Sequence, residues 1–312
     1  MDHIFLISAM APLKKHPSKF SLVRRPALPV MPVLLVMLAP VEAHAQEQEQ
    51  VRMPELPILQ TGRVAPLPAD AASPQAWLLL EDGTRIRPDL LLPQDLAPLL
   101  NSLTGQTISA HGTDGTPDRH RRLPSQITRG ASPTDWWQAD VVRQGQARVW
   151  TDGAATPLQK TLLDLEDDAR HRHRGHWQTA DWQPVCARHP ERLRSGTFVI
   201  LHGDIRQATV RQGTLWLDFG EDWRTDTSVT LPAAVLKEGG KSWRQPAFWT
   251  GKTIEARGWV QGRAGSGSGP RLDLSGSGQI RFLHQDTGAC RHDPQANRET
   301  GREASRKASR KD

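Results

Sequence analysis

The sequence predicts a mainly β protein with a few helices, an α+β chain organised as two small domains in series. Short apolar runs bounded by Gly, Pro, Asn or Asp recur along residues 76–283, which is typical of strands joined by turns. One segment, 157–174, has the three- and four-residue apolar spacing of a helix. With 312 residues, the chain is long enough for two modest cores once its ends are removed.

The first 45 residues have the pattern of a targeting segment. Five Lys or Arg residues precede an apolar run at 27–38, and Ala43-His44-Ala45 is a small-x-small cleavage sequence. The apolar run is too short to cross a bilayer and contains two prolines. We therefore expect a signal peptide cleaved after Ala45, a periplasmic or secreted location, and no membrane span after cleavage. Translation from Met10 is an alternative start.

Most of the net charge of +6 lies at the two ends of the chain. Residues 1–45 carry five Lys or Arg against two acids, and residues 297–312 carry six against three. The remainder is close to neutral, so a basic face for nucleic acid must be local and balanced by acids elsewhere. Because its sequence is basic and of low complexity, we expect segment 286–312 to be a disordered tail.

The region after the leader divides into a linker and a first domain. Residues 46–73 are rich in Pro, Gln and Glu without a sustained period, which is typical of a linker. The first domain is expected at 74–178. It opens with a hairpin at 76–87, where Asp82-Gly83 forms the turn.

Two helices are expected later in this domain. The first runs from Gln138 to Gly145 and is followed by a short strand ending at Trp150. The second begins after Thr156, a residue type favoured as an N-cap, and ends at Gly175.

The second domain, expected at 179–285, has a different pattern of elements. One helix is predicted at 232–236, between the third and fourth of five strands. The predicted strands are 198–209, 214–220, 227–231, 253–260 and 271–283. Five strands with a helix between the third and fourth suit a small closed barrel such as an OB-fold.

Three motifs follow one another at characteristic spacing: Asp118-Arg-His-Arg-Arg122, Gly145-Gln-Ala-Arg-Val149 and a helix closing on Gly175-His-Trp177. In order and spacing they resemble the thermonuclease (staphylococcal-nuclease-like) family, with its Asp-basic-Tyr-Gly-Arg turn, Gly-Leu-Ala-Arg-Val strand and Gly-Leu-Trp helix end. The resemblance implies an OB-like five-stranded barrel of thermonuclease type in a divergent bacterial member. Residues 217–224 and 251–260 resemble a companion domain that follows thermonuclease domains in some bacterial proteins, which implies a second small OB-like barrel.

The resemblance also implies Ca²⁺-dependent hydrolysis of phosphodiester bonds in DNA or RNA. That chemistry needs carboxylates to hold the metal ion, a base to activate water, and cations to neutralise the phosphoryl oxygens. The family has one arginine on the strand before an Asp-x-Pro-Glu turn and a second at the end of the Asp-basic-Tyr-Gly-Arg motif. Arg87 and Arg122 take these two positions.

The Asp-x-Pro-Glu turn itself is replaced by Leu91-Leu92-Pro93-Gln94. Leucine cannot bind calcium, and glutamine cannot accept a proton from water. Candidate metal ligands near this turn and near the hairpin are Asp82, Asp89 and Asp95. The family's glycine in the Asp-basic-Tyr-Gly-Arg motif is Arg121 here, which matters if the turn needs a positive φ.

Three functional hypotheses follow. The chain is an active Ca²⁺-dependent nuclease, or it binds nucleic acid without cleavage, with Arg119, Arg121, Arg122 and Arg129 contacting phosphates. The third is an inactive periplasmic interaction or scaffold module with no nucleic-acid contact, in which these arginines belong to a solvated loop.

The two cysteines, Cys186 and Cys290, favour a disulfide because export would place them in an oxidising compartment. The alternative is a zinc site that adds His189 and His292.

Other candidate residues have structural explanations. The histidines His171, His173 and His176 are spaced so that they point to different faces of a helix, and we expect a polar helix end rather than a metal site. Glu166 matches a structural glutamate of the resembled family. Trp216, Trp223, Trp243, Trp249 and Trp259 all lie in the second domain, where they either stack on bases or pack in the core.

Overall fold

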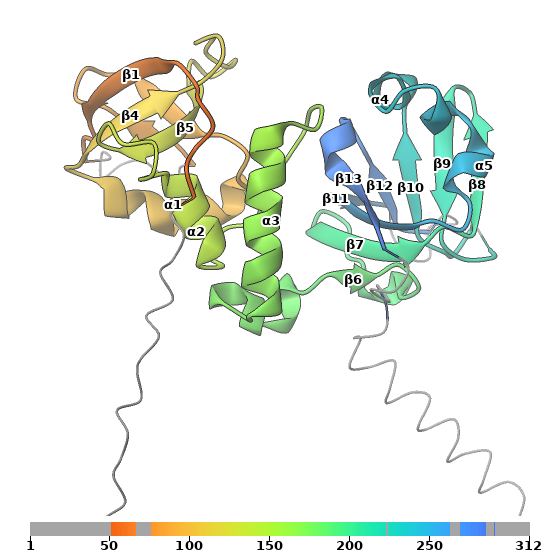
Figure 1. The fold of residues 1–312 in the computed structure, drawn as a ribbon. Helices are drawn as coiled ribbons and strands as arrows, with labels where there is room; N and C mark the ends of the chain where they lie inside the picture. Colours follow the sequence, from red (N-terminus) through yellow and green to blue (C-terminus); the bar gives the residue numbers. More distant parts are fainter. Residues whose placement is uncertain (1–50, 67–75, 223, 263–268, 285–289, 291–312) are drawn as a thin grey trace, which may run out of the picture. The chain divides into compact units, whose positions relative to one another are not determined.

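The computed structural model describes residues 51–66, 76–222, 224–262, 269–284 and 290 (Figure 1). Every described residue belongs to one compact unit, which begins at residue 49. The expected signal peptide lies outside the described residues, as does the expected tail apart from Cys290. No helix in the described ranges is long and apolar enough to cross a membrane.

The described residues form an α+β fold with two mixed sheets and few helices. The first sheet has five strands in the order β1-β4-β5-β3-β2. Their bounds are β1 Ile58–Arg63, β2 Leu78–Leu79, β3 Arg85–Pro88, β4 Thr107–His111 and β5 Leu123–Arg129. Neighbours are antiparallel except β3 and β5, which run parallel. A further isolated bridge joins Val64, just after β1, to Leu80, just after β2.

Strand β1 lies inside 46–73, where the sequence predicted a linker. It pairs with β4 over its length, with Gly62 opposite Ile108, and Met53 before it is buried in the first core. All six residues of β1 are exposed or only partly buried, so no clear apolar alternation marks the strand in the sequence. The folded region therefore begins before residue 74.

Three α-helices accompany the first sheet: α1 (Pro93–Leu100), α2 (Trp137–Arg143) and α3 (Pro157–His171). As predicted, Thr156 caps α3, and its hydroxyl accepts the Gln159 N–H at 3.1 Å. Helix α1 was not predicted because Pro93 and Pro98 conceal it. Pro93 occupies the first turn, where its missing N–H costs nothing, and Leu96 and Leu100 are buried on one face.

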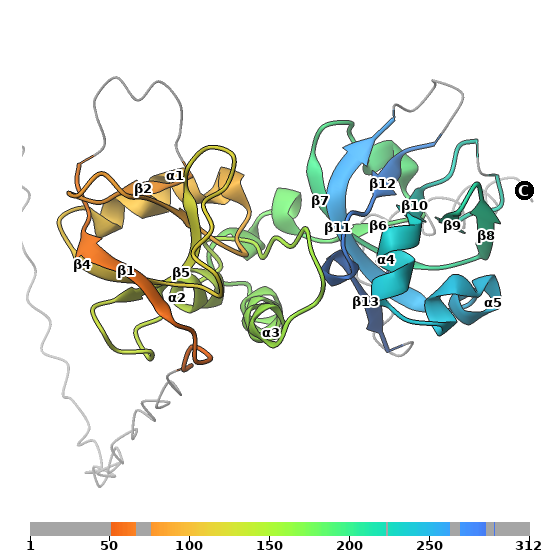
Figure 2. The ribbon, with the colours of Figure 1, turned by 90° about the horizontal axis from the view of Figure 1, so that it is seen from above.

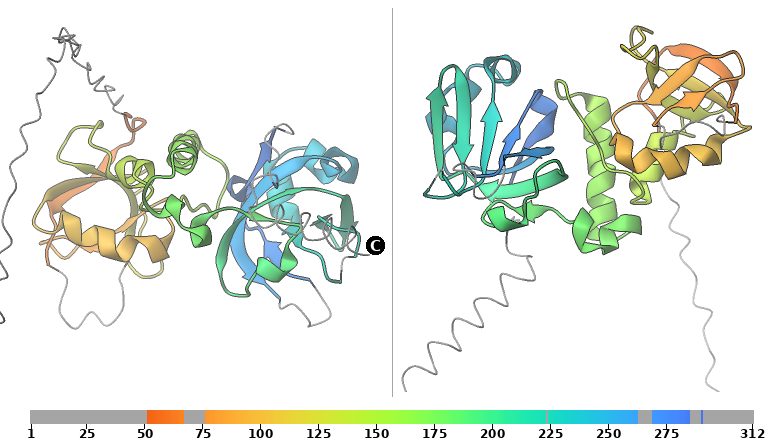
Figure 3. Two further views of the ribbon diagram at one scale, coloured as in Figure 1. Left: turned by 90° about the horizontal axis from the view of Figure 1, so that it is seen from below. Right: turned by 180° about the vertical axis from the view of Figure 1, so that it is seen from behind.

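The second sheet has eight strands, in the order β6-β7-β11-β12-β10-β9-β8 with β13 paired to β11. The strands are β6 Val185–Cys186, β7 Phe198–Asp204, β8 Gln207–Arg211, β9 Thr214–Asp218, β10 Ser228–Leu231, β11 Thr253–Gln261, β12 Arg271–Asp273 and β13 Ile280–Leu283. Helices α4 (Ala233–Glu238) and α5 (Pro246–Trp249) follow β10 and precede β11 along the chain. Figure 3 shows the ribbon of this part, in green to blue, from two further sides. The first and last of the five predicted strands are each split in two: β7 and β8, and β12 and β13.

Helix α3 and the second sheet are joined by what we call the buried charge network: Glu166, Asp167 and Arg170 on α3, Glu255 and Arg257 on β11, and Arg281 on β13. Arg257 donates from Nη2 to Glu166 and to Glu255, at 2.7 Å each. Glu166 also accepts the Val149 N–H at 2.7 Å. Its structural role in this network agrees with the sequence interpretation.

Candidate functional site

The turn before β5, Asp118–Arg122, is organised by its first residue. The Arg121 N–H donates to the Asp118 carbonyl at 2.8 Å, and the Asp118 N–H donates to the Arg122 carbonyl at 2.7 Å. Asp118 Oδ1 accepts the N–H groups of His120 at 2.8 Å and Arg122 at 3.0 Å. An aspartate is suited to this position because it satisfies turn donors that would otherwise have only solvent as partner.

Arg121 adopts the left-handed backbone conformation, with φ = 59°. This is the position at which the resembled family has glycine. A side chain in this region costs roughly 1–2 kcal/mol, whereas glycine adopts it without steric conflict. The turn therefore carries the strain of a side chain at this φ.

Replacing Arg121 by glycine is expected to raise the free energy of unfolding by about 0.5–1 kcal/mol, after the entropy cost of glycine in the unfolded chain. Urea unfolding followed by tryptophan fluorescence measures this change. The matched control is Arg119→Gly in the same turn, where φ is not positive. A gain in both variants, or in neither, would contradict the explanation.

Two arginines converge on Asp118, forming what we call the arginine-pair site: Arg87, Asp89, Asp118 and Arg122. Arg122 donates from Nε to Asp118 Oδ2 at 2.9 Å and lies 2.8 Å from it through Nη2. Arg87 Nε lies 3.6 Å from the same oxygen, and its Nη2 lies 3.2 Å from Asp89 Oδ1. Because Arg87 belongs to β3, the parallel neighbour of β5, the pairing of these strands brings the two guanidinium groups together.

Both carboxylates of the site are affected by their surroundings. Desolvation acts to raise the pKa of Asp118, but hydrogen bonds from Arg122 and from the His120 N–H outweigh it and lower the pKa to about 2. The pKa of Asp89 is raised by burial, against the opposing effect of Arg87. At neutral pH, Asp118 is therefore a firmly charged anchor that holds the arginine pair in place.

The other two predicted metal ligands lie elsewhere. Asp82 is in the β2–β3 turn, where it accepts the Thr84 N–H at 2.8 Å and a hydrogen bond from the Gln60 side chain. Strand β3 separates the two residues, with Asp82 in the turn before it and Asp89 directly after its last residue. Asp95 pairs with Arg148 through both carboxylate oxygens, at 2.9 and 3.0 Å, and also accepts the Arg148 N–H.

The residues that stand where the resembled family has Asp-x-Pro-Glu are part of the scaffold in this chain. Leu91 is buried and bridges to Val149, and Pro93 and Gln94 begin helix α1. Within the described ranges, no group of three or more His, Cys, Asp or Glu side chains is arranged to hold a metal ion. The structure thus brings Asp89 to the arginine pair, but not Asp82 or Asp95.

The remaining predicted phosphate ligands divide into two kinds. Arg119 and Arg121 are exposed in the turn beside the arginine pair. Arg129 is already paired with two carboxylates, Asp135 at 2.9 Å and Asp140. Only Arg119 and Arg121 are placed to meet a ligand at this site.

The sequence analysis included Asp118 in the motif but did not identify it as the centre of the site. The available signal was its position, two and four residues before the N–H groups that it binds.

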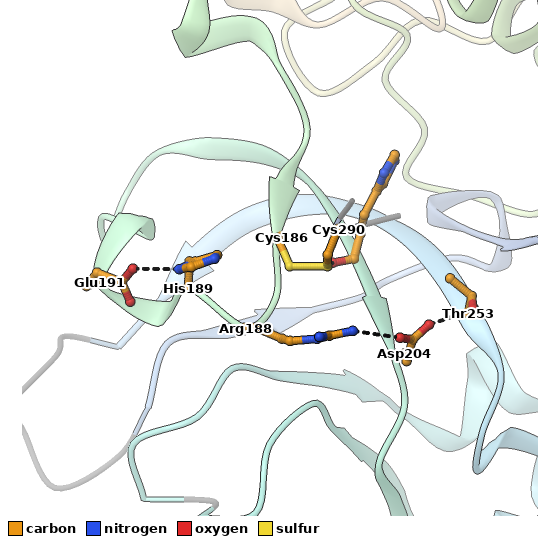
Figure 4. The surroundings of a disulfide bond; sticks show 8 residues. Cys186, Arg188, His189, Glu191, Asp204, Thr253 and Cys290 are labelled. Atoms are coloured by element: carbon orange, nitrogen blue, oxygen red, sulfur yellow. Dashed lines mark hydrogen bonds and ion pairs between the residues drawn. A yellow bond between two sulfur atoms is a disulfide. The ribbon is translucent and has the colours of Figure 1, made fainter. Parts of the chain in front are cut away.

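A disulfide joins Cys186 to Cys290, with Cα atoms 5.2 Å apart (Figure 4). This is the pairing that the sequence analysis favoured, and it removes both thiolates from the alternative zinc site. Nearby, His189 Nδ1 lies 3.0 Å from Glu191. His176 stacks on Trp182, which is consistent with the polar helix end expected there.

No protein-family model matches this chain, and no curated protein matches its sequence.

Proposed function

We propose that this chain is an exported, divergent thermonuclease-like protein that binds phosphodiester groups of nucleic acid through Arg87 and Arg122 without hydrolysing them. The observation that carries the proposal is the convergence of two guanidinium groups, one from strand β3 and one from the turn before β5, on Asp118. Asp118 uses the Nε and Nη2 groups of Arg122, which leaves the Nη1 hydrogens for a phosphate oxygen. Paired arginines suit phosphate because their planar donors match its geometry.

We also propose that each sheet closes as an OB-like barrel. The Val64–Leu80 bridge connects the two outer strands of the first sheet. In the second sheet, β7 is second in the strand order and β8 is last, yet only Ile205 and Arg206 separate them in the sequence. This short connection brings the two ends of the sheet towards each other. Each sheet also contains a comparable parallel pair, β3–β5 and β10–β12, which supports two related barrels in series.

The donor set argues against calcium-dependent hydrolysis at this site. A calcium ion needs several oxygen ligands, and the site offers Asp89 and an Asp118 already bound to both arginines. Leu91 and Gln94 cannot replace the missing acids. The residues therefore do not fit the Ca²⁺ of the resembled family, and we derive no metal-assisted step.

An interaction or scaffold module without nucleic-acid contact is the second candidate. It is favoured by the local charge balance, because two aspartates offset the two arginines of the site. Under the first proposal, the binding of nucleic acid must therefore depend on the geometry of the site and on the exposed Arg119 and Arg121, because the site has no strongly positive field.

Fluorescence anisotropy with a labelled single-stranded oligonucleotide tests the proposal. Arg87→Ala and Arg122→Ala are each expected to weaken binding about tenfold, since each removes a charge-assisted phosphate contact. Each should also reduce the slope of log affinity against log salt concentration by about one, the value expected for one lost phosphate contact.

Arg63→Ala is the matched control, because Arg63 is an exposed arginine of the same sheet, paired only loosely with Glu81 at 3.7 Å. Circular dichroism checks that all variants are folded. No detectable binding by the wild type would favour the scaffold candidate, and equal affinity in the wild type and all three variants would place the binding away from Arg87 and Arg122.

A further inference from the structure

The segment between β10 and β11 is basic and aromatic. Residues 232–252 contain four basic side chains and a single acid, Glu238. Glu238 is engaged by the Ser277 N–H at 2.8 Å. Among the described residues, Lys237, Lys241 and Arg244 form no ion pair. The positive charge of this segment is therefore not neutralised by its neighbours.

An apolar groove of about 540 Å³ lies between helix α4 and the β8–β9 hairpin. Its apolar lining includes Val210, Ala233, Ala234 and Leu236, and its two cations are Lys237 and Arg244. Val210 is 49 % exposed although it is a large aliphatic side chain. The groove thus combines an apolar surface with two cationic groups.

An aromatic cluster adjoins this groove. Phe282, which is 42 % exposed, lies 6.1 Å from Trp243, 5.6 Å from Phe248 and 5.3 Å from Trp249 between ring centroids. The ammonium of Lys252 lies 4.6 Å from the Phe248 ring and 5.6 Å from the Phe282 ring. Trp243 directly precedes Arg244, so the cluster and the groove are continuous in the chain.

We call this region the α4–α5 surface: the groove residues, Lys241, the aromatic cluster and Lys252. Figure 2 shows α4 and α5 on the same side of the second sheet. Three large hydrophobic side chains are exposed in the described ranges, and two of them, Val210 and Phe282, belong to this surface. Unneutralised cations and exposed apolar side chains therefore occur together.

We propose that the α4–α5 surface binds the surface of a bilayer that contains anionic phospholipid. Lys237 and Arg244 contact the lipid phosphate, and the apolar groove accepts hydrocarbon next to it. Trp243 and Phe282 lie at the level of the headgroups, where aromatic side chains are favoured. The groove itself fits hydrocarbon better than bases, because its aliphatic Val210, Ala233 and Ala234 offer no stacking platform.

Co-sedimentation of residues 49–312, the compact unit that holds every described residue, with phospholipid vesicles tests this proposal. Vesicles of phosphatidylcholine with phosphatidylglycerol are expected to bind the protein, and vesicles of phosphatidylcholine alone are not. The double variant Lys237→Gln/Arg244→Gln is expected to bind the anionic vesicles about 30-fold more weakly. Phe282→Ser should weaken binding at every salt concentration.

The matched control is Lys160→Gln/Arg172→Gln, which also removes two positive charges. Lys160 lies on α3 and Arg172 directly after it, and their side chains are 77 % and 53 % exposed. It should weaken binding less than the test variant does. Equal losses in the two double variants, or no binding to anionic vesicles, would overturn the proposal. Loss of oligonucleotide binding in Lys237→Gln/Arg244→Gln with unchanged vesicle binding would also overturn it, in favour of a nucleic-acid surface. The arginine-pair variants should bind vesicles like the wild type, because this proposal does not depend on that site.

Discussion

Arg257→Met is expected to lower the free energy of unfolding by about 3–5 kcal/mol at neutral pH. The arginine is 1 % exposed and donates to Glu166, Glu255 and the Val149 carbonyl. Methionine nearly fills the space but leaves two fully buried glutamates without their shared partner. Burial acts to raise the pKa of Glu255, and Arg170, Arg257 and Arg281 together hold it well below its usual range. Urea unfolding followed by fluorescence measures the loss.

Two further variants distinguish lost charge pairing from a general packing defect. Combining Arg257→Met with Glu166→Gln removes the carboxylate that has lost its closest cation and should recover part of the lost stability, whereas Glu255 keeps Arg170 and Arg281 as partners. Arg172→Met, at an exposed ion pair with Asp168, should cost less than about 1 kcal/mol. If Arg257→Met cost no more than this control, the network would not be a main link between α3 and the second sheet.

The double variant Cys186→Ser/Cys290→Ser is expected to lose about 4–5 kcal/mol relative to the oxidised protein. The disulfide closes a loop across a sequence separation of 104 residues, so it removes much conformational freedom from the unfolded chain. Thermal and urea unfolding with and without reductant measure the effect. Reductant should destabilise the wild type to the level of the double variant and leave the variant unchanged. Equal stability of the oxidised and reduced wild type would contradict this explanation.

The elements with a strong local signal were predicted well. Helix α3 has a capping threonine, a proline in its first turn and regular apolar spacing, and it begins where these residues place it. The β2–β3 hairpin forms around Asp82-Gly83, with Gly83 at φ = 86°. In both cases the residues that decide the structure are neighbours in the sequence.

Elements without such a signal were missed. Strand β1 has no clear apolar alternation and depends on pairing with β4, about fifty residues later in the chain. Helix α1 begins at a proline and contains another, which a local analysis takes as a turn. Tertiary packing determines whether both elements form, and the residues next to them in the sequence do not reveal that packing.

The residues of the candidate site were likewise predicted only in part. Arg87 and Arg122 were chosen from motif positions, and the structure brings them to one carboxylate. Asp82, Asp89 and Asp95 were equivalent in sequence, yet only Asp89 reaches the site. Asp95 is held by Arg148, more than fifty residues away, which the spacing of acids alone does not reveal.

The central claim is that the arginine pair binds nucleic-acid phosphate without cleaving it. The most direct measurement incubates residues 49–312 with labelled single-stranded DNA, with Ca²⁺ or with chelator, and reads the bound fraction and the product length from the same sample. We expect a bound fraction that does not depend on Ca²⁺, is reduced in Arg87→Ala and Arg122→Ala, and contains only full-length DNA. Ca²⁺-dependent shortening of the DNA that is lost in Arg122→Ala would contradict the claim and identify an active nuclease.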